Sequence, residues 1–542
     1  MRPNTQRYIL LCGAAALALV ASPAAAQKDA GQARTTVQPY IEVSQTIDAD
    51  LESGDVLTYT SAAAGIDVAF DTPRLSAQAS YRYEYRFSWD DDYGDESVHS
   101  GLARASFRLT PILTLEGGAL ATRTRYDIRG EAPGVFGADE RNVTQLYSLY
   151  AGPTMSTYAG PVEVNALYRI GYTKVETPDG SPVIAGQPRF DYYDDSVGHI
   201  AGVTAALAPR TLLPVGLTAS AGAERETSGA LKQRYGSWFV RGDVLAPISP
   251  TVALQAGVGY EEIETSQRSA LLTPTGAPVV DENGRFVLDD ASARRVTYRT
   301  DGVYYDAGVV WRPSRRTSVS ASVGKRYGST SYTGSASWAA SPTVGVQIGV
   351  YDTVTTFGRQ LRTGISNLPT SFIATRDQFA QAFNGCTFGT QGSAPGGCLD
   401  SVFQSVTTAS YRARGVDAVV SATRGRNSFG GGLGYANRKL FAPDRPGITI
   451  YGLEDESYYA QVFFSRQLSP VSGLDLQAFA DYYDPALAGS EDVFSTGATA
   501  SYSHGFGRLS TSASFGIYHF RVGDGIDDSW RAQALLGARY SF

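Results

Sequence analysis

The sequence has little of what most catalytic and metal-binding sites require. It contains three cysteines and four histidines in 542 residues, too few for zinc clusters, iron–sulfur clusters or a disulfide-dense scaffold. The histidines, at positions 99, 199, 504 and 519, are scattered over different segments. No nucleophile-elbow, phosphate-loop or paired-cysteine motif is present. These absences argue against an enzyme and against any cofactor or metal.

Long apolar runs are also missing after the first 20 residues, which excludes a membrane protein built from spanning helices. At the N-terminus, two arginines precede the 12-residue apolar stretch Ile9–Val20, and small residues follow at Pro23–Ala26. A retained membrane helix would need about 20 apolar residues. The pattern instead predicts a secretory signal peptide over residues 1–26. Residues 27–542 show no linker or composition shift and are expected to form one unit.

Acidic residues outnumber basic residues in the expected mature chain. Removing residues 1–26 takes away two arginines and no acid, which leaves 44 basic and 53 acidic residues and a net charge of −9. This balance argues against nucleic acid as a partner. The 33 tyrosines, 23 phenylalanines and 43% apolar residues nevertheless indicate a folded chain.

Strict alternation of apolar and polar residues fills much of the sequence. Between residues 75 and 89 one face carries Leu75, Ala77, Ala79, Tyr81, Tyr83, Tyr85, Phe87 and Trp89. The residues between them are polar, and residues 162–173 repeat the pattern. Because successive side chains of a strand point to opposite faces, each segment reads as a strand between an apolar and a polar medium. The aromatic residues at one end of the apolar face are typical of a girdle at a membrane surface.

We count about 22 such segments, each long enough to cross a bilayer as a tilted strand. Their connections alternate between short turns and longer polar loops, of which 264–300 and 352–406 are the longest. In lipid every backbone polar group needs an internal partner, so the sheet must close. The sequence predicts an all-β fold, a single antiparallel transmembrane barrel of about 22 strands (range about 18–24) with short periplasmic turns, long extracellular loops and no separate plug domain. A propeller would show a period of about 40 residues, which is absent.

The polar strand faces are expected to line the lumen. The predicted pore-lining residues are Arg82, Glu84, Arg86, Arg104, Arg108, Arg169, Arg241, Asp243 and Arg539. The arginines could pair with anionic or sugar-acid solutes through bidentate hydrogen bonds. A ladder of structural ion pairs is an equally good interpretation, because both signs of charge occur.

Two loops carry residues of further interest. Cys386 and Cys398 are the only cysteines of the expected mature chain, and an oxidising compartment predicts a disulfide between them. The bridge would stiffen a segment that enters the pore, or it would protect an exposed loop. The acidic run Asp90–Glu96 could bind a divalent cation and bridge to lipopolysaccharide, although such runs are more often solvated surface.

The C-terminal strand carries a resemblance. Gly537, Tyr540 and the terminal Phe542 resemble the signal of bacterial outer-membrane proteins that the barrel assembly machinery recognises, and Leu535 departs from the polar residue usual there. Residues 350–352, 357–361, 368–372 and 386–398 make the chain look like a porin-type barrel family of sphingomonad-like alphaproteobacteria. Chains of that family sometimes carry the name of a preprotein translocase subunit, a small protein with one spanning helix that this sequence does not resemble.

The resemblance and the alternation together imply a protein of the Gram-negative outer membrane, exported through the periplasm and surrounded by lipid and lipopolysaccharide. In the expected mature chain about ten residues, 27–36, precede the first expected strand, too few for the N-terminal plug of TonB-dependent transporters. We therefore expect a pore for passive or export passage of small solutes, narrowed by loops 264–300 and 352–406. The alternative is a surface structural or binding barrel, associated with exopolysaccharide or the envelope, without an open channel.

Overall fold

The structure is a computed structural model. It describes residues 34–89, 95–125, 143–176, 193–229, 231–281, 285–392, 394–403, 406–443, 451–485, 490–523 and 527–542. The predicted signal peptide and most of the acidic run at 90–96 lie outside these ranges. Within them, no helix has the length and apolarity needed to cross a membrane.

Twenty-two strands form one antiparallel sheet. The first eleven are β1 (Arg34–Asp50), β2 (Val56–Asp71), β3 (Leu75–Ser88), β4 (Glu96–Arg108), β5 (Leu113–Arg125), β6 (Val143–Ala159), β7 (Val162–Val175), β8 (Asp195–Leu207), β9 (Gly216–Ser228), β10 (Gln233–Pro247) and β11 (Val252–Gln267). The others are β12 (Arg295–Ser314), β13 (Thr317–Arg326), β14 (Ser329–Ser341), β15 (Val344–Thr355), β19 (Ser410–Arg424), β20 (Asn427–Phe441), β21 (Glu454–Ser469), β22 (Ser472–Asp484), β23 (Val493–Phe506), β24 (Leu509–Val522) and β25 (Asp527–Ser541).

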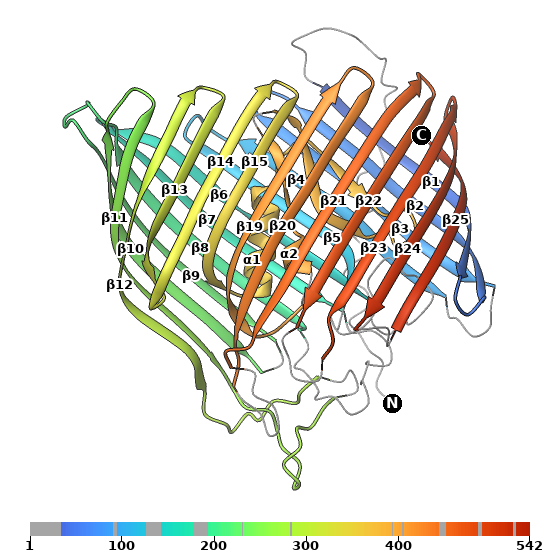
Figure 1. The fold of residues 1–542 in the computed structure, drawn as a ribbon, viewed down its shortest axis with the longest axis horizontal. Helices are drawn as coiled ribbons and strands as arrows, with labels where there is room; N and C mark the ends of the chain where they lie inside the picture. Colours follow the sequence, from blue (N-terminus) through green and yellow to red (C-terminus); the bar gives the residue numbers. More distant parts are fainter. Residues whose placement is uncertain are drawn as a thin grey trace.

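The sheet closes on itself. Val43 of β1 lies opposite Ala62 of β2 on one side and opposite Ala538 of β25 on the other. The first and last strands are therefore neighbours, and the ring has no free edge (Figure 1). Closure gives every strand a partner on both sides, which is the condition for a sheet in lipid. The predicted barrel of about 22 strands is confirmed.

The connections sort by length as expected. At one end of the ring, which we name the short-turn end, two to eight residues join each pair of strands. The longer connections lie at the opposite, long-loop end, although Tyr327–Gly328 is a two-residue turn there. Both of its residues have positive φ (54° and 72°), the conformation that suits the right-handed twist of a tight hairpin.

Alternation along each strand separates two surfaces. On β3, Tyr81 and Phe87 are 40% and 46% exposed on the outside of the ring, whereas Arg82 and Arg86 are 3% and 2% exposed on the inside. The predicted division between an apolar outer face and a polar inner face is therefore correct for this strand. It follows from the period of two alone.

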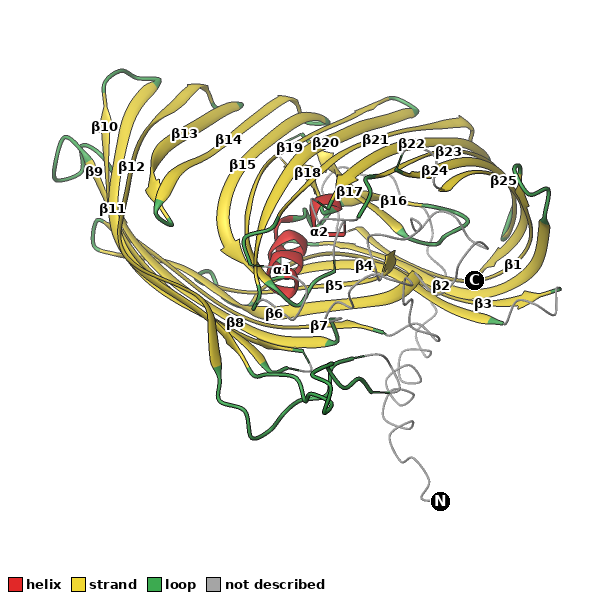
Figure 2. Ribbon diagram, turned by 60° about the horizontal axis from the view of Figure 1, so that its bottom comes forward, coloured by secondary structure: helices red, strands yellow, loops and turns green. Residues whose placement is uncertain are grey.

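One long connection turns back into the ring. Residues 356–409, here named the inward segment, join β15 to β19. They contain α1 (Phe357–Asn367), β16 (Phe372–Arg376), β17 (Phe383–Gln391), β18 (Ala394–Cys398) and α2 (Asp400–Phe403). Figure 2 shows α1, α2 and the small sheet β16–β18 inside the ring. The expectation that loop 352–406 enters the lumen is met by this placement.

The other long loop behaves differently. The connection between β11 and β12 extends away from the strands at the long-loop end (Figure 1). Its Arg285 forms an ion pair with Asp194, at 2.8 Å, beside the start of β8. Its Arg268 N–H donates to the carbonyl of Leu231 in the β9–β10 turn. The expectation that loop 264–300 narrows the lumen is not supported, because its described part lies over neighbouring hairpins.

Candidate functional site

Helix α1 is fixed to one wall of the lumen by an apolar face. Leu361 and Ile365, one turn apart, belong to a fully buried cluster with Leu102, Leu120 and Leu146 of β4, β5 and β6. Those three leucines occupy positions on the inner face, where the alternation calls for polar residues. Their contact with a helix was not predicted from the sequence. Apolar exceptions on the polar faces of three adjacent strands are the signal that indicates a packed inner element.

The same helix carries a basic face toward β9. Arg359 forms an ion pair with Glu224, and Arg362 forms one with Glu226. Thr356, the N-cap of α1, also donates to Glu226 at 2.7 Å. Burial lowers the pKa of Arg359, but the Glu224 carboxylate outweighs burial and raises that pKa above its ordinary value. Arg359 therefore stays charged, and both ion pairs attach α1 to the wall.

The C-terminal end of α1 is also held by arginines. Arg104 donates to the carbonyls of Ser366 at 2.9 Å and Leu368 at 3.0 Å. Arg169 donates to the Ser366 hydroxyl at 3.0 Å. Cations at this end of a helix satisfy unpaired carbonyls and oppose the negative end of the helix dipole. Two of the predicted pore-lining arginines thus bind this end of α1.

Strand β16 and the turn after it contact other parts of the ring. The side-chain amide of Gln78 on β3 accepts from Phe372 N and donates to Phe372 O, both at 2.8 Å. Arg86 donates to the carbonyl of Phe379 at 2.6 Å. On the opposite side of β1, Tyr518 of β24 donates to Asp377 at 2.6 Å. The inward segment is therefore attached to strands on several sides of the lumen.

The hairpin β17–β18 is closed by a disulfide between Cys386 and Cys398. The bridge lies against Gly432 of β20, where an added Cβ would sit 2.5 Å and 2.6 Å from the two sulfurs. Glycine is required here because the disulfide approaches the wall so closely. Within the described ranges, the one group of potential metal ligands is this cysteine pair with Asp400. Disulfide sulfurs offer no thiolate to a metal.

Most of the predicted pore-lining residues form ion pairs within the wall. Arg82 contacts Glu42 at 2.9 Å and Glu84 at 2.6 Å, and Glu84 also accepts from Arg86 at 2.7 Å. The other residues of the set make these contacts: Arg169 with Glu116, Arg241 with Asp243 and Asp306, and Arg539 with Asp67. Arg108 is exposed at the end of β4. The contacts favour the ion-pair interpretation over an arginine cluster for anions.

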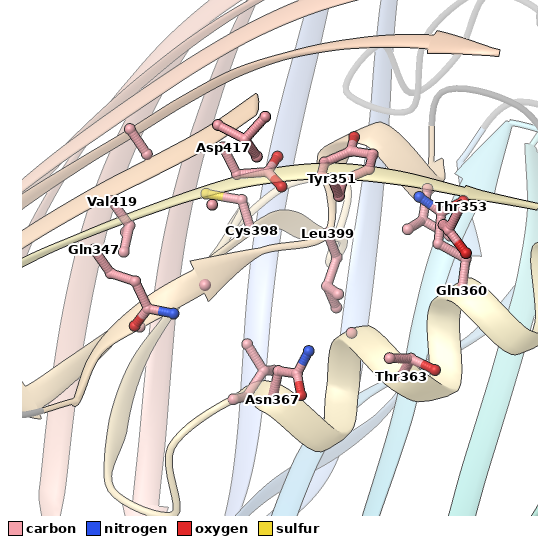
Figure 3. A pocket seen from close by; sticks show the side chains of 18 of the residues that line it. Gln347, Tyr351, Thr353, Gln360, Thr363, Asn367, Cys398, Leu399, Asp417 and Val419 are labelled. Atoms are coloured by element: carbon pink, nitrogen blue, oxygen red, sulfur yellow. The ribbon is translucent and has the colours of Figure 1, made fainter. Parts of the chain in front are cut away.

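Two cavities flank the inward segment. The first, of about 360 Å³, lies between α1, β18 and the wall formed by β15 and β19. Figure 3 shows Thr363 and Asn367 of α1 and Gln347 of β15 around it. The second, of about 460 Å³, lies between β16 and the inner faces of β2, β3 and β21–β23. Volumes of this size accommodate small molecules.

The predicted assembly-signal residues lie at the seam of the ring. Gly537 and Tyr540 belong to β25, which pairs with β1, and Phe542 follows this strand. Leu535, the departure from the signal, is buried on the inner face and belongs to a cluster with Phe379 of the inward segment. Contact with the inward segment therefore accounts for an apolar residue at this position.

No family model and no curated protein matches the sequence. Among solved structures, the siderophore receptor PiuA from Acinetobacter baumannii is similar over 93% of this chain and 82% of its own, at 11% identity and a TM-score of 0.42. The ferric-catecholate import receptor Fiu from E. coli is similar over 93% of this chain and 81% of its own, at 11% identity and a TM-score of 0.43. The alcaligin receptor FauA from Bordetella pertussis is similar over 93% of this chain and 76% of its own, at 11% identity and a TM-score of 0.38. At these values the likeness does not identify a solute or an energy source for this chain.

Proposed function

We propose that this chain is an outer-membrane barrel through which small solutes pass beside a fixed inward segment. The observation that carries the proposal is the attachment of one segment to several sides of a closed ring, with a cavity on each side of it. A 22-stranded ring encloses a wide lumen unless something fills it. The inward segment would reduce that lumen to narrow passages without closing it.

Placement in a membrane is supported by the outer surface of the ring. Large apolar side chains are exposed there on strand after strand, among them Val303 at 67% and Leu536 at 68%. Water would penalise so extended an apolar surface, whereas lipid would not. The proposal includes location in the Gram-negative outer membrane and export through the periplasm by the predicted signal peptide. It also includes insertion by the barrel assembly machinery and contact with lipopolysaccharide. Membership of the porin-type family, which depends on the sequence resemblance alone, is a further part of it.

Passive passage is favoured over a plug that leaves the barrel. Removing α1 from the lumen would separate the buried pair Arg362–Glu226 and expose the apolar cluster around Leu361 and Ile365. Separating a buried ion pair costs about 3–5 kcal/mol, and apolar burial adds to that cost. Solutes would therefore pass alongside the segment while it stays in place.

Planar-bilayer recordings test the proposal. Thr355 of β15 lies opposite Tyr411 of β19, so deleting residues 357–406 leaves four residues, Thr356 and 407–409, to join β15 to β19 in a short hairpin. The intact protein should give discrete conductance steps, and the deletion variant should give larger steps of the same kind. A barrel that is blocked and serves only as an envelope or exopolysaccharide-binding surface would conduct only after the deletion. Absence of conductance from both forms would refute the pore.

A further inference from the structure

Over most of their length the inner faces of β13 and β14 carry hydroxyl groups, and the charged exception is Arg326 at the end of β13. On these strands Val323, Tyr332 and Trp338 are exposed on the outside of the ring. Alternation then turns the intervening residues inward. These are Ser320, Ser322, Ser331, Thr333, Ser335 and Ser337, named here the hydroxyl wall. Ser320 and Ser335 are joined by a hydrogen bond of 2.9 Å, and Ser322 accepts from Gln255 at 2.6 Å.

The wall continues across β15 to the cavity beside α1. β14 pairs with β15, whose Gln347 and Thr353 line that cavity. From the other side, α1 presents Thr363 and Asn367, which are both exposed and one turn apart. These two residues lie on the face of α1 opposite the buried Leu361 and Ile365 face. Uncharged hydrogen-bonding groups therefore line both sides of this passage (Figure 3).

Charged side chains near the passage pair with side chains of opposite charge or accept hydrogen bonds from other strands of the ring. Arg241 binds Asp306 at 2.6 Å, and Arg326 binds Glu261 at 2.6 Å. In the cavity itself, Arg359 is paired with Glu224. The carboxylate of Asp417 accepts a hydrogen bond from Tyr459. A charged solute in this passage would lose water without gaining a strong counter-charge.

We infer that the passage between the hydroxyl wall and α1 takes neutral polyhydroxylated solutes of the size of simple sugars. Hydroxyl and amide groups can each donate and accept, so they match a solute that carries the same groups around its ring. A solute lacking them leaves the lining groups unpaired at each position that it covers. This inference depends on the proposed pore function and names its solute class.

Liposome swelling with three probes of similar size tests the class of solute. The intact protein should admit glucose about fivefold faster than gluconate or glucosamine, the ratio expected of about one net hydrogen bond. Glycerol serves as a probe of any open pore. If liposomes swell with glycerol but admit gluconate or glucosamine faster than glucose, the inference is overturned while the proposed pore function is still supported. No swelling with glycerol would instead refute the pore.

Variants of the lining separate binding from folding. Thr333→Val with Ser335→Ala removes two hydroxyls from the wall at nearly constant volume, and the ratio of glucose to glycerol entry should fall severalfold. The matched control is Thr330→Val on the outer face of the same strand, which should leave the ratio unchanged. If the double variant and Thr330→Val gave the same ratio of glucose to glycerol entry, the inference would be overturned.

A charge placed on α1 provides a second, independent measurement. Thr363→Asp with Asn367→Asp should make glucosamine the fastest hexose probe, because two carboxylates would then face the passage. Thr275→Asp, in the exposed loop between β11 and β12, should keep the order of the three probes. An unchanged order in the double variant would show that solutes do not pass α1, and the inference would fail.

Discussion

Arg362 of α1 and Glu226 of β9 form an ion pair inside the ring, and their side chains are only 5% and 2% exposed. The two residues are separated by 136 positions in the sequence. Arg362 also donates to the hydroxyls of Thr173 and Ser196, each at 3.0 Å. One side chain thus joins the inward segment to β7, β8 and β9.

Replacing the acid of this pair should release α1. Glu226→Ala leaves the Arg362 guanidinium buried without its counter-charge, which costs about 3–5 kcal/mol. We expect faster hydrogen exchange across α1 and noisier channel currents, with the barrel itself intact. Adding Arg362→Met should recover much of the protection, because an apolar side chain of similar volume then replaces the charge.

Glu262 provides the control for Glu226. It pairs with Arg299 at 3.3 Å on a surface where the side chains are 33% and 55% exposed. Exposed pairs contribute at most about 1 kcal/mol, so Glu262→Ala should leave the exchange of α1 unchanged. If Glu226→Ala behaved like Glu262→Ala, the buried pair would not be what fixes the helix.

Neighbouring leucines in the last strand offer a matched comparison. Leu535 is buried with Phe379 on the inner face, whereas Leu536 is exposed on the outer face. Leu535→Ala should lower the free energy of unfolding by about 2–5 kcal/mol through loss of buried contacts. Leu536→Ala should cost less, since its packing with lipid is adaptable. Urea titrations in detergent micelles measure both, and a larger effect of Leu536→Ala would contradict the packing of Leu535 against the inward segment.

Gly432 tests the contact between the disulfide and the wall. In Gly432→Val the new side chain would overlap Cys386 and Cys398, and overpacking of this kind costs about 1–3 kcal/mol. Hydrogen exchange of the β17–β18 hairpin should rise. Gly242→Val is the control, because a Cβ there meets nothing within 4 Å and valine favours strands. Equal exchange in the two variants would mean that the hairpin does not lie against β20.

The attachment of the inward segment should depend on pH through Asp400. Burial raises the pKa of this carboxyl well above its ordinary value, and the nearby Asp481 and Asp417 carboxylates raise it further. The folded state therefore binds more protons than the unfolded state from roughly pH 4 up to the raised pKa. Stability contributed by Asp400 is present at acidic pH and is lost as the pH rises through that window.

Asp400→Asn removes this dependence because its amide does not titrate. Proteolysis of the inward segment, measured from acidic to alkaline pH, should accelerate with rising pH in the unmodified protein. The variant should show a flatter profile. A protein in which resistance to proteolysis increases with pH, with the same profile in Asp400→Asn, would contradict the raised pKa.

The barrel could be predicted because its pattern is local. Alternation at residues 75–89 separates a lipid face from a lumen face with no knowledge of neighbouring strands. The same argument predicts that Arg82, Arg241 and Arg539 lie on the inner face, and their contacts with Glu84, Asp306 and Asp67 agree with that face. The apolar exceptions at Leu102, Leu120 and Leu146 were in the sequence too, but they have meaning only once an inner helix is known.

A closed sheet can be predicted from the sequence alone, because a two-residue period and the need to pair every backbone group leave few other solutions in lipid. Which loop enters the ring becomes clear only from the folded structure. Loops 264–300 and 352–406 are both long and polar, and the difference between them depends on pairings such as Arg104 with Ser366, 262 positions apart. Such contacts form from closure of the whole ring, so no local pattern specifies them.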